Sequence, residues 1–303
     1  MHKCPTCGSP ILFSVSPGKH DFKTALQRWI EDIELEDASY AYLRQLRGYS
    51  KNHFLPFFKS SDVRSISGVQ IKEFRRVLLK KGLSDKTLKN VLGAFQTFLF
   101  WMCEEELIGA VPRFPRRKKK VIRPVREKKW IDQETQFKVL NMVAHEPTRL
   151  CIAVMIETGI RPCEAAAVHK DDLREGGINI CRALDERRVE KPEKNGKVFF
   201  RPLSAELYKN LCELSRSRPG AALLFLNKRG SRFSKNHLWR FWEKACAALG
   251  IKISIYQATR HSKASQKRAV LEERMLEELR RELEHSTAKT TLKHYALGKE
   301  KKI

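Results

Sequence analysis

The amino-acid sequence predicts a mainly helical protein with one small antiparallel sheet, divided into an all-helical N-terminal domain and an α+β C-terminal domain. Three observations lead to this prediction. The length of 303 residues suggests roughly two domains. Apolar residues recur at three- and four-residue spacing, which is typical of amphipathic helices. Strand-forming runs with a hairpin signal appear only after a basic, proline-containing stretch at 112–129.

The helical domain is predicted to span residues 21–111, after a short leader at 1–20. Asp21 is a suitable cap for a first helix, and further helices are expected at about 40–57 and 68–82. The clearest helix follows Ser84. Its apolar stripe comprises Leu88, Val91, Leu92, Phe95, Phe98, Leu99 and Met102.

Residues 112–129 are predicted to be an extended basic linker between the domains. The stretch contains prolines and an uninterrupted cationic run, namely Arg116, Arg117, Lys118, Lys119 and Lys120. A solvated segment or a localisation signal is the plainer interpretation of such a run. In so basic a protein, a strand of positive charge along a phosphate backbone is favoured.

The C-terminal domain is expected to fill residues 130–303. Strands are predicted at 177–182, 197–201 and 223–226. Helices are expected at about 132–144, 147–158, 162–168, 204–216, 234–249, 257–269, 271–283 and 288–296. The helix over 271–283 carries an apolar stripe that should pack on the core: Leu271, Met275, Leu276, Leu279 and Leu283.

Composition narrows the class of partner. Lys and Arg total 60 against 35 acidic residues, so the net charge of +25 favours a polyanion. Nucleic acid is favoured over membrane, because there is no apolar run of about 20 residues, basic amphipathic helix or lipidation motif. The start of the sequence lacks the apolar core of a signal peptide, so a cytoplasmic, nucleoid-associated protein is expected.

The eight cysteines are mostly scattered singly, which fits reduced thiols better than a disulfide framework. Cys4 and Cys7 form a knuckle-type half site for zinc. A closed structural zinc site needs four ligands, and the sequence has no second cysteine pair. A plain turn, or a knuckle completed by a partner, is therefore favoured, and no metal is expected.

The segment 158–164 places an arginine at a predicted corner between two helices. Gly159 ends the first helix, and Pro162 stands in the first turn of the next, where proline is tolerated. Arg161 then lies beside a freed helix N-terminus, which suits anion binding, and Glu164 can brace its guanidinium. The alternative is an ordinary surface Arg–Glu pair.

Further polar groups follow. Asn195-Gly196 is a two-residue hairpin signal that would present Lys194 on a rigid arm, with Lys197 across the turn as the reserve. Arg260, His285 and Tyr295 come later in the chain. Two arginines, a histidine and a tyrosine are sufficient to attack a phosphodiester: the arginines neutralise the non-bridging oxygens, the histidine donates to one of them, and the tyrosine is the nucleophile.

The order and spacing of these residues resemble the tyrosine recombinases, the phage integrase family. Thr158-Gly-Ile-Arg-Pro-Cys-Glu matches the pattern Thr-Gly-x-Arg-x-x-Glu at every specified position. Gln257 replaces the histidine of the second box, His-x-x-Arg; it retains hydrogen-bonding capacity but has no acid–base capacity. Glu284 replaces the glycine of Leu-Gly-His-Ser. Residues 130–303 match the catalytic domain's order of boxes, and 21–111 match the general character of a helical, SAM-like core-binding domain.

The resemblance implies a site-specific recombinase for double-stranded DNA that cleaves and rejoins strands through a covalent 3′-phosphotyrosine, as a homotetramer on paired sites of a mobile element. It implies no cofactor, neither ATP nor metal. Tyr295 would attack, and Lys194 would protonate the leaving 5′-oxygen. Arg161, Arg260 and His285 would stabilise the transition state, with Glu164 and Gln257 as auxiliary residues. Two alternatives remain: a non-catalytic DNA-binding protein on a decayed recombinase scaffold, and a topoisomerase-like relaxing enzyme.

Overall fold

The structure, a computed structural model, describes residues 21–59, 61–114, 129–192 and 196–283. The chain separates into two compact units, residues 1–123 and 124–303. The fold is mostly helical with small antiparallel sheets, which confirms the predicted fold class. In the described part of the chain, no helix is long and apolar enough to cross a membrane.

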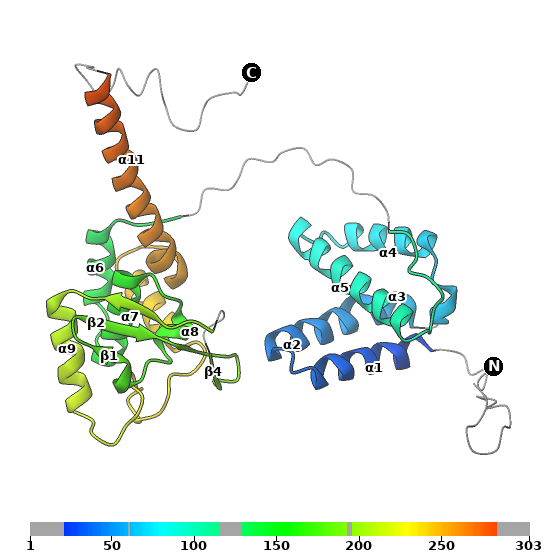
Figure 1. Ribbon diagram of the computed structural model, residues 1–303, viewed down its shortest axis with the longest axis horizontal. Coiled ribbons are helices and arrows are strands. Elements are labelled where there is room, and N and C mark those ends of the chain that lie inside the picture. Colours follow the sequence, from blue (N-terminus) through cyan, green and yellow to red (C-terminus); the bar gives the residue numbers. More distant parts are fainter. Residues whose placement is uncertain (1–20, 60, 115–128, 193–195, 284–303) are drawn as a thin grey trace, which may run out of the picture. The chain divides into compact units, whose positions relative to one another are not determined.

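The described part of the first unit is a helical bundle (Figure 1). Its elements are α1 (Phe22–Leu35), α2 (Tyr40–Tyr49), a π-helical turn at Ser50–Phe54, α3 (Leu55–Phe58), a 3-10 turn at Val63–Ser65, α4 (Gly68–Lys80) and α5 (Asp85–Glu104). The helix starts follow local capping chemistry, because Asp21, Ser67 and Ser84 accept hydrogen bonds from the first turns of α1, α4 and α5.

Phenylalanines fill the core of this bundle. Phe58 stacks on Phe95 with ring centroids 4.8 Å apart, and Phe22 and Phe74 lie against the same rings. All four side chains are fully buried. Because such rings bury large apolar areas and interlock in tilted and stacked pairs, they hold the short helices together.

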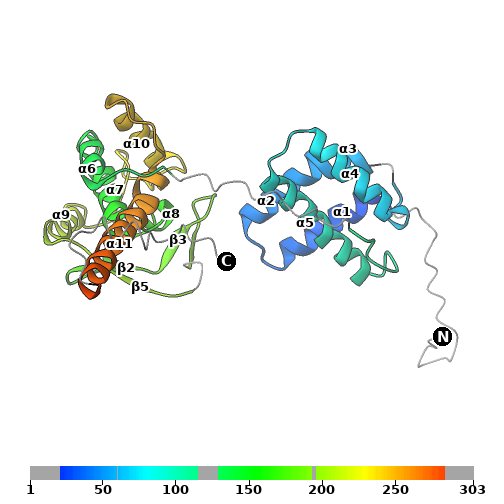
Figure 2. The same ribbon diagram turned by 90° about the horizontal axis from the view of Figure 1, so that it is seen from above.

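The second unit packs helices around α7 (Glu146–Thr158), whose residues are buried over most of its length. The other helices are α6 (Gln133–Asn141), α8 (Pro162–Ala165), α9 (Ala205–Arg216), α10 (His237–Ala248) and α11 (Ser262–Glu282), with a 3-10 turn at Lys170–Asp172 and a π-helical turn at Gln257–His261. Seen from above, β2 and β5 lie along one side of the unit and α10 along the opposite side (Figure 2).

The strands form two small antiparallel sheets, where the sequence predicted one. The first has the order β1 (Leu173–Arg174), β2 (Gly177–Ile180), β5 (Phe199–Pro202); the second pairs β3 (Arg182–Leu184) with β4 (Glu190–Pro192). The register of the first sheet sets Gly177 opposite Pro202. A side chain at Gly177 would meet the Arg201 carbonyl at 2.4 Å, so only glycine fits this strand pair.

Three predicted elements differ from the structure. Residues 223–226 make only isolated bridges, from Leu223 to His169 and from Leu226 to Arg232, and not a strand. The two helices expected at 257–269 and 271–283 are one continuous helical run, because no glycine or proline interrupts it. The stripe expected on the core is exposed, with Leu271 49% and Met275 54% accessible.

Candidate functional site

The two predicted arginines meet at one corner of the second unit. Gly159 ends α7 in the left-handed conformation, with φ of 71°, which turns the chain sharply into Arg161 at the start of α8. Arg260 lies in the π-helical turn before α11. Its Nη1 donates to the Gly159 carbonyl at 2.9 Å, across 101 positions of sequence. The Arg260 guanidinium therefore contacts the backbone two residues before Arg161.

Glu164 fixes the orientation of Arg161. The carboxylate accepts from the Arg161 backbone N–H at 2.8 Å and from Nη1 at 2.5 Å. Glu164 is buried, whereas the Arg161 side chain keeps 37% of its surface exposed. The hydrogen bond from Glu164 is the main cause that raises the pKa of Arg161. Arg161 is thus a permanent, partly accessible cation with a fixed direction.

The helix that follows Arg161 is too short to act as the predicted anion-binding site. The sequence suggested an anion-binding helix N-terminus at Pro162, but α8 is a single turn of four residues. A macrodipole builds up over several aligned peptide units, so a single turn adds little positive potential. The charge at this corner comes from the arginine side chains.

Tyr256 and Cys163 lie beside Arg161. Both contribute smaller electrostatic effects that raise its pKa further. The Tyr256 ring stands edge-on to His261 at a centroid distance of 5.0 Å, and the tyrosine is 39% exposed. Within the described part of the second unit, a phenol therefore stands next to the arginine corner.

Gln257 is engaged in capping its own helical turn. Its Oε1 accepts from the Ser254 backbone N–H at 3.4 Å and from the Ser254 hydroxyl at 2.9 Å, and its backbone N–H donates to that hydroxyl at 3.3 Å. This reciprocal pair is a capping box, which satisfies exposed backbone donors at a helix start. Gln257 also lines a groove of about 870 Å³ with Trp239 and Trp242, and neither arginine lines that groove.

The turn that carries Arg260 is anchored by residues that the sequence did not single out. The carbonyl of Ala258 accepts from the buried amide of Gln136, and the carbonyl of Gln257 accepts from the Ser262 hydroxyl at 2.9 Å. Gln266 binds Gln136 at 3.1 Å and the Ile131 carbonyl at 2.9 Å. A π-helical turn displaces carbonyls from the regular ladder, and these side chains satisfy them. The sequence predicts that Gln136 lies on a helix, but it does not show that its side chain is buried under the turn of Arg260.

A second pair of arginines lies in the β3–β4 hairpin region. Arg188 adopts a positive φ of 67° at the hairpin turn, and its Nε and one Nη are buried without a hydrogen-bond partner. Burial and the neighbouring Arg232 lower its pKa. Arg232 itself pairs with Glu190 at 2.5 Å. Sequence reasoning missed this cluster, because nothing in the linear order of a hairpin shows which of its arginines turns inward.

Several predicted site residues lie outside the described residues: Lys194, His285, Tyr295, the basic run Arg116, Arg117, Lys118, Lys119 and Lys120, and the zinc candidates Cys4 and Cys7. Their roles stay predictions. Among the described residues, no group of three or more potential metal ligands comes together.

Comparisons with known proteins find integrases by sequence and by structure. The model of the family described as "Phage integrase family" matches residues 129–301. The ICEBs1 integrase of Bacillus subtilis (strain 168) is 26% identical over 159 residues, which are 50% of this chain and 41% of that protein. The chain therefore spans about two fifths of the length of this relative.

Solved structures show the same fold. The Tn1549 transposon integrase in complex with a circular intermediate DNA superimposes with a TM-score of 0.66 at 16% identity, covering 89% of this chain and 94% of that one. A lambda integrase dimer bound to a COC′ core site gives 0.61 at 14% identity, with 93% and 98% covered. A lambda integrase tetramer bound to a Holliday junction gives 0.59 at 13% identity, with 81% and 71% covered.

Proposed function

This chain belongs to the phage integrase family, and from that membership we propose that it is a site-specific DNA recombinase that breaks and rejoins strands through a covalent 3′-phosphotyrosine. The observation that supports this most directly is the meeting of Arg161 and Arg260 at the Gly159 corner. Two cations held by separate elements can contact both non-bridging oxygens of one phosphate, where negative charge builds up during attack.

In this reaction Tyr295 attacks the scissile phosphorus as the phenolate, and the bond from phosphorus to the 5′-oxygen breaks. Lys194 transfers a proton to that oxygen, so a free 5′-hydroxyl leaves. Arg161, Arg260 and His285 stabilise the charged transition state. The phosphotyrosine retains the energy of the broken phosphodiester, so a 5′-hydroxyl from another strand can reverse the same steps without ATP.

Glu164 orients the Arg161 guanidinium through its hydrogen bonds. Gln257 acts by capping the turn of Arg260, and this role is supported by its hydrogen bonds to Ser254. We assign DNA binding to the helical domain at 21–111 and to the basic linker at 112–129, and catalysis to 130–303. The run Arg116–Lys120 would contact phosphates, so DNA affinity should fall steeply with salt.

The solved relatives include an integrase dimer on a core site and a tetramer on a Holliday junction. By analogy, this chain would act as a homotetramer on two paired double-stranded sites, in the cytoplasm with its DNA. The function would be recombination of a mobile element by integration, excision, transposition or resolution.

A duplex with a nick beside the cleavage point tests the proposal, because the short 3′ fragment diffuses away and traps the covalent intermediate. The duplex would carry the inverted repeats that flank the gene. The purified protein should form a denaturation-resistant DNA adduct that Tyr295→Phe abolishes. Tyr208→Phe on α9 is the matched control and should retain the adduct.

Other outcomes would point to other functions. Specific DNA binding without any adduct would favour the non-catalytic alternative. Relaxation of plasmid without site preference would favour the topoisomerase-like one. An adduct that survives Tyr295→Phe but disappears in Tyr256→Phe would identify Tyr256, the tyrosine beside Arg161, as the nucleophile.

A further inference from the structure

The π-helical turn before α11 decides which side chains lie beside Arg260. The Ser262 backbone N–H donates to the Gln257 carbonyl, which closes the turn across five positions. In so wide a turn, side chains four and five positions apart share one side, which places Tyr256 with Arg260 and His261. The Tyr256 ring indeed stands edge-on to His261, five positions later, with centroids 5.0 Å apart.

Gln257, three positions before Arg260, is directed to another side of the turn. Its Oε1 accepts hydrogen bonds from the Ser254 backbone N–H and hydroxyl, and the side chain lines the groove beside α10. Neither Tyr256 nor Arg260 lines that groove. The cap therefore holds the Gln257 amide, and the side of the turn that carries Arg260 presents the Tyr256 phenol.

The Tyr256 phenol also adjoins Arg161. After the larger effect of the Glu164 hydrogen bond, an electrostatic interaction with Tyr256 contributes to the raised pKa of Arg161. In the described part of the chain, the Tyr256 hydroxyl makes no hydrogen bond, and the tyrosine is 39% exposed. This hydroxyl is therefore open to a ligand that approaches the two arginines.

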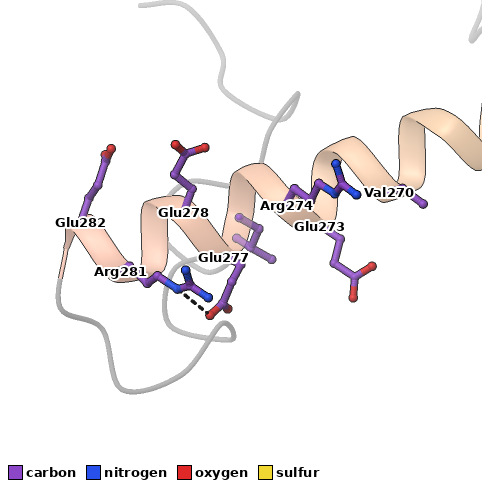
Figure 3. A pocket seen from close by; sticks show the side chains of 8 residues that line it. Val270, Glu273, Arg274, Glu277, Glu278, Arg281 and Glu282 are labelled. Carbon is purple, nitrogen blue, oxygen red and sulfur yellow. Dashed lines mark ion pairs between the residues drawn. The ribbon is translucent and has the colours of Figure 1, made fainter.

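The far half of α11 has the opposite charge. Figure 3 shows a hollow of about 780 Å³ along this half of the helix. Its charged lining residues are four glutamates and two arginines, namely Glu273, Glu277, Glu278, Glu282, Arg274 and Arg281. Arg281 pairs with Glu277 at 3.4 Å, so its charge is partly neutralised. Excess negative charge repels a phosphate, which directs a DNA phosphate to the arginine corner before α11.

We propose that the Tyr256 hydroxyl donates a hydrogen bond to a non-bridging oxygen of the DNA phosphate that Arg161 and Arg260 bind. The proposal rests on the proposed function, because it adds a catalytic residue to the same site. Gln257 stands where the second box has histidine, but the cap holds its side chain, so the preceding residue supplies the donor. The phenol donates without losing its proton, so the contact stabilises negative charge on the oxygen and no bond to Tyr256 forms.

Tyr256→Phe tests the contact because it removes only the hydroxyl. The ring keeps its contact with His261, so the melting temperature should stay unchanged. On the nicked duplex, the single-turnover rate of adduct formation should fall about 10- to 100-fold, less than for a fully buried donor, because water reaches this hydroxyl. DNA affinity should change little. Tyr208→Phe on α9 is the matched control and should keep the wild-type rate.

Sulfur substitution at the scissile phosphate identifies the oxygen that the hydroxyl contacts. Sulfur retains the negative charge but accepts hydrogen bonds weakly, and each phosphorothioate diastereomer replaces one of the non-bridging oxygens. On one diastereomer, Tyr256→Phe should be slower than the wild-type protein by less than about threefold, because the substrate has already lost the contact. On the other diastereomer the variant should show its full loss. A residue that only supports the fold would show the same loss on every substrate.

Two results would overturn the contact and leave the proposed function standing. One is a wild-type rate of adduct formation in Tyr256→Phe, and the other is an equal loss of rate on the natural phosphate and on both diastereomers. An adduct that maps to Tyr256 itself would also overturn the contact, because the residue would then be the nucleophile. Absence of the adduct from the wild-type protein on its cognate duplex would overturn both proposals.

Discussion

Replacing Glu164 by alanine removes the group that holds Arg161 in place. The buried carboxylate makes two hydrogen bonds, to the Arg161 backbone N–H at 2.8 Å and to Nη1 at 2.5 Å. Breaking a fully buried ion pair costs about 3–5 kcal/mol, but the Arg161 side chain is 37% exposed, so water can solvate the freed guanidinium. We therefore expect a loss of about 2 kcal/mol, dominated by the unsatisfied backbone N–H and the altered packing.

Thermal and denaturant unfolding measure this loss directly. For a unit of this size, about 2 kcal/mol corresponds to a melting temperature lower by roughly 4–8 °C. Glu164→Gln is the control, because its amide oxygen can still accept one hydrogen bond, and it should lose about half as much. The same variants report on positioning: Glu164→Ala should lower the cleavage rate about 10- to 100-fold while DNA affinity changes little. Unchanged unfolding together with unchanged cleavage would refute the role of Glu164.

Two further predictions concern neighbouring groups. Gln257→His should not speed cleavage, and it should lower the free energy of unfolding by about 0.5–1 kcal/mol, because it breaks the capping pair with Ser254. Gln257→Glu keeps the hydrogen-bond acceptor and serves as the control. Faster cleavage by the histidine variant would show that glutamine impairs the natural site. Burial, with smaller effects of His145, Arg240 and Arg188, lowers the pKa of His237 from 6.5 to about 4. Below pH 6.5, His237 binds a proton in the unfolded chain but not in the folded chain. The free energy of unfolding should therefore fall as the pH drops from about 6.5 to 4. Urea midpoints measured across that range, with a flatter profile in His237→Gln, would check this.

The helical parts of the fold were predictable because their signals are local. The stripe that starts at Leu88 gives α5, which begins directly after Ser84 as predicted. The corner at Gly159 and Pro162 was equally readable, since a left-handed glycine and a first-turn proline each impose their own backbone angles. Arg161 and Glu164 follow from that corner, because residues three apart on a helical turn face each other.

Other features depend on contacts between distant segments. The bond from Arg260 to the Gly159 carbonyl, the Gln136 amide under the turn of Arg260, and the inward arginine at position 188 have no local signature. The run 223–226 has strand-like composition, yet it forms only bridges, because a strand exists only where a neighbour pairs with it.

The sequence by itself determined the helical class, the order of the candidate catalytic residues and the chemistry that their types allow, because these follow from composition, periodicity and motif. The tertiary structure alone decided that Gln257 serves a cap and that the apolar side of α11 faces outward. The physical reason is that periodicity shows which side of a helix is apolar but not what lies opposite it. Whether α11 continues past the core or folds back on it depends on the packing of the whole unit.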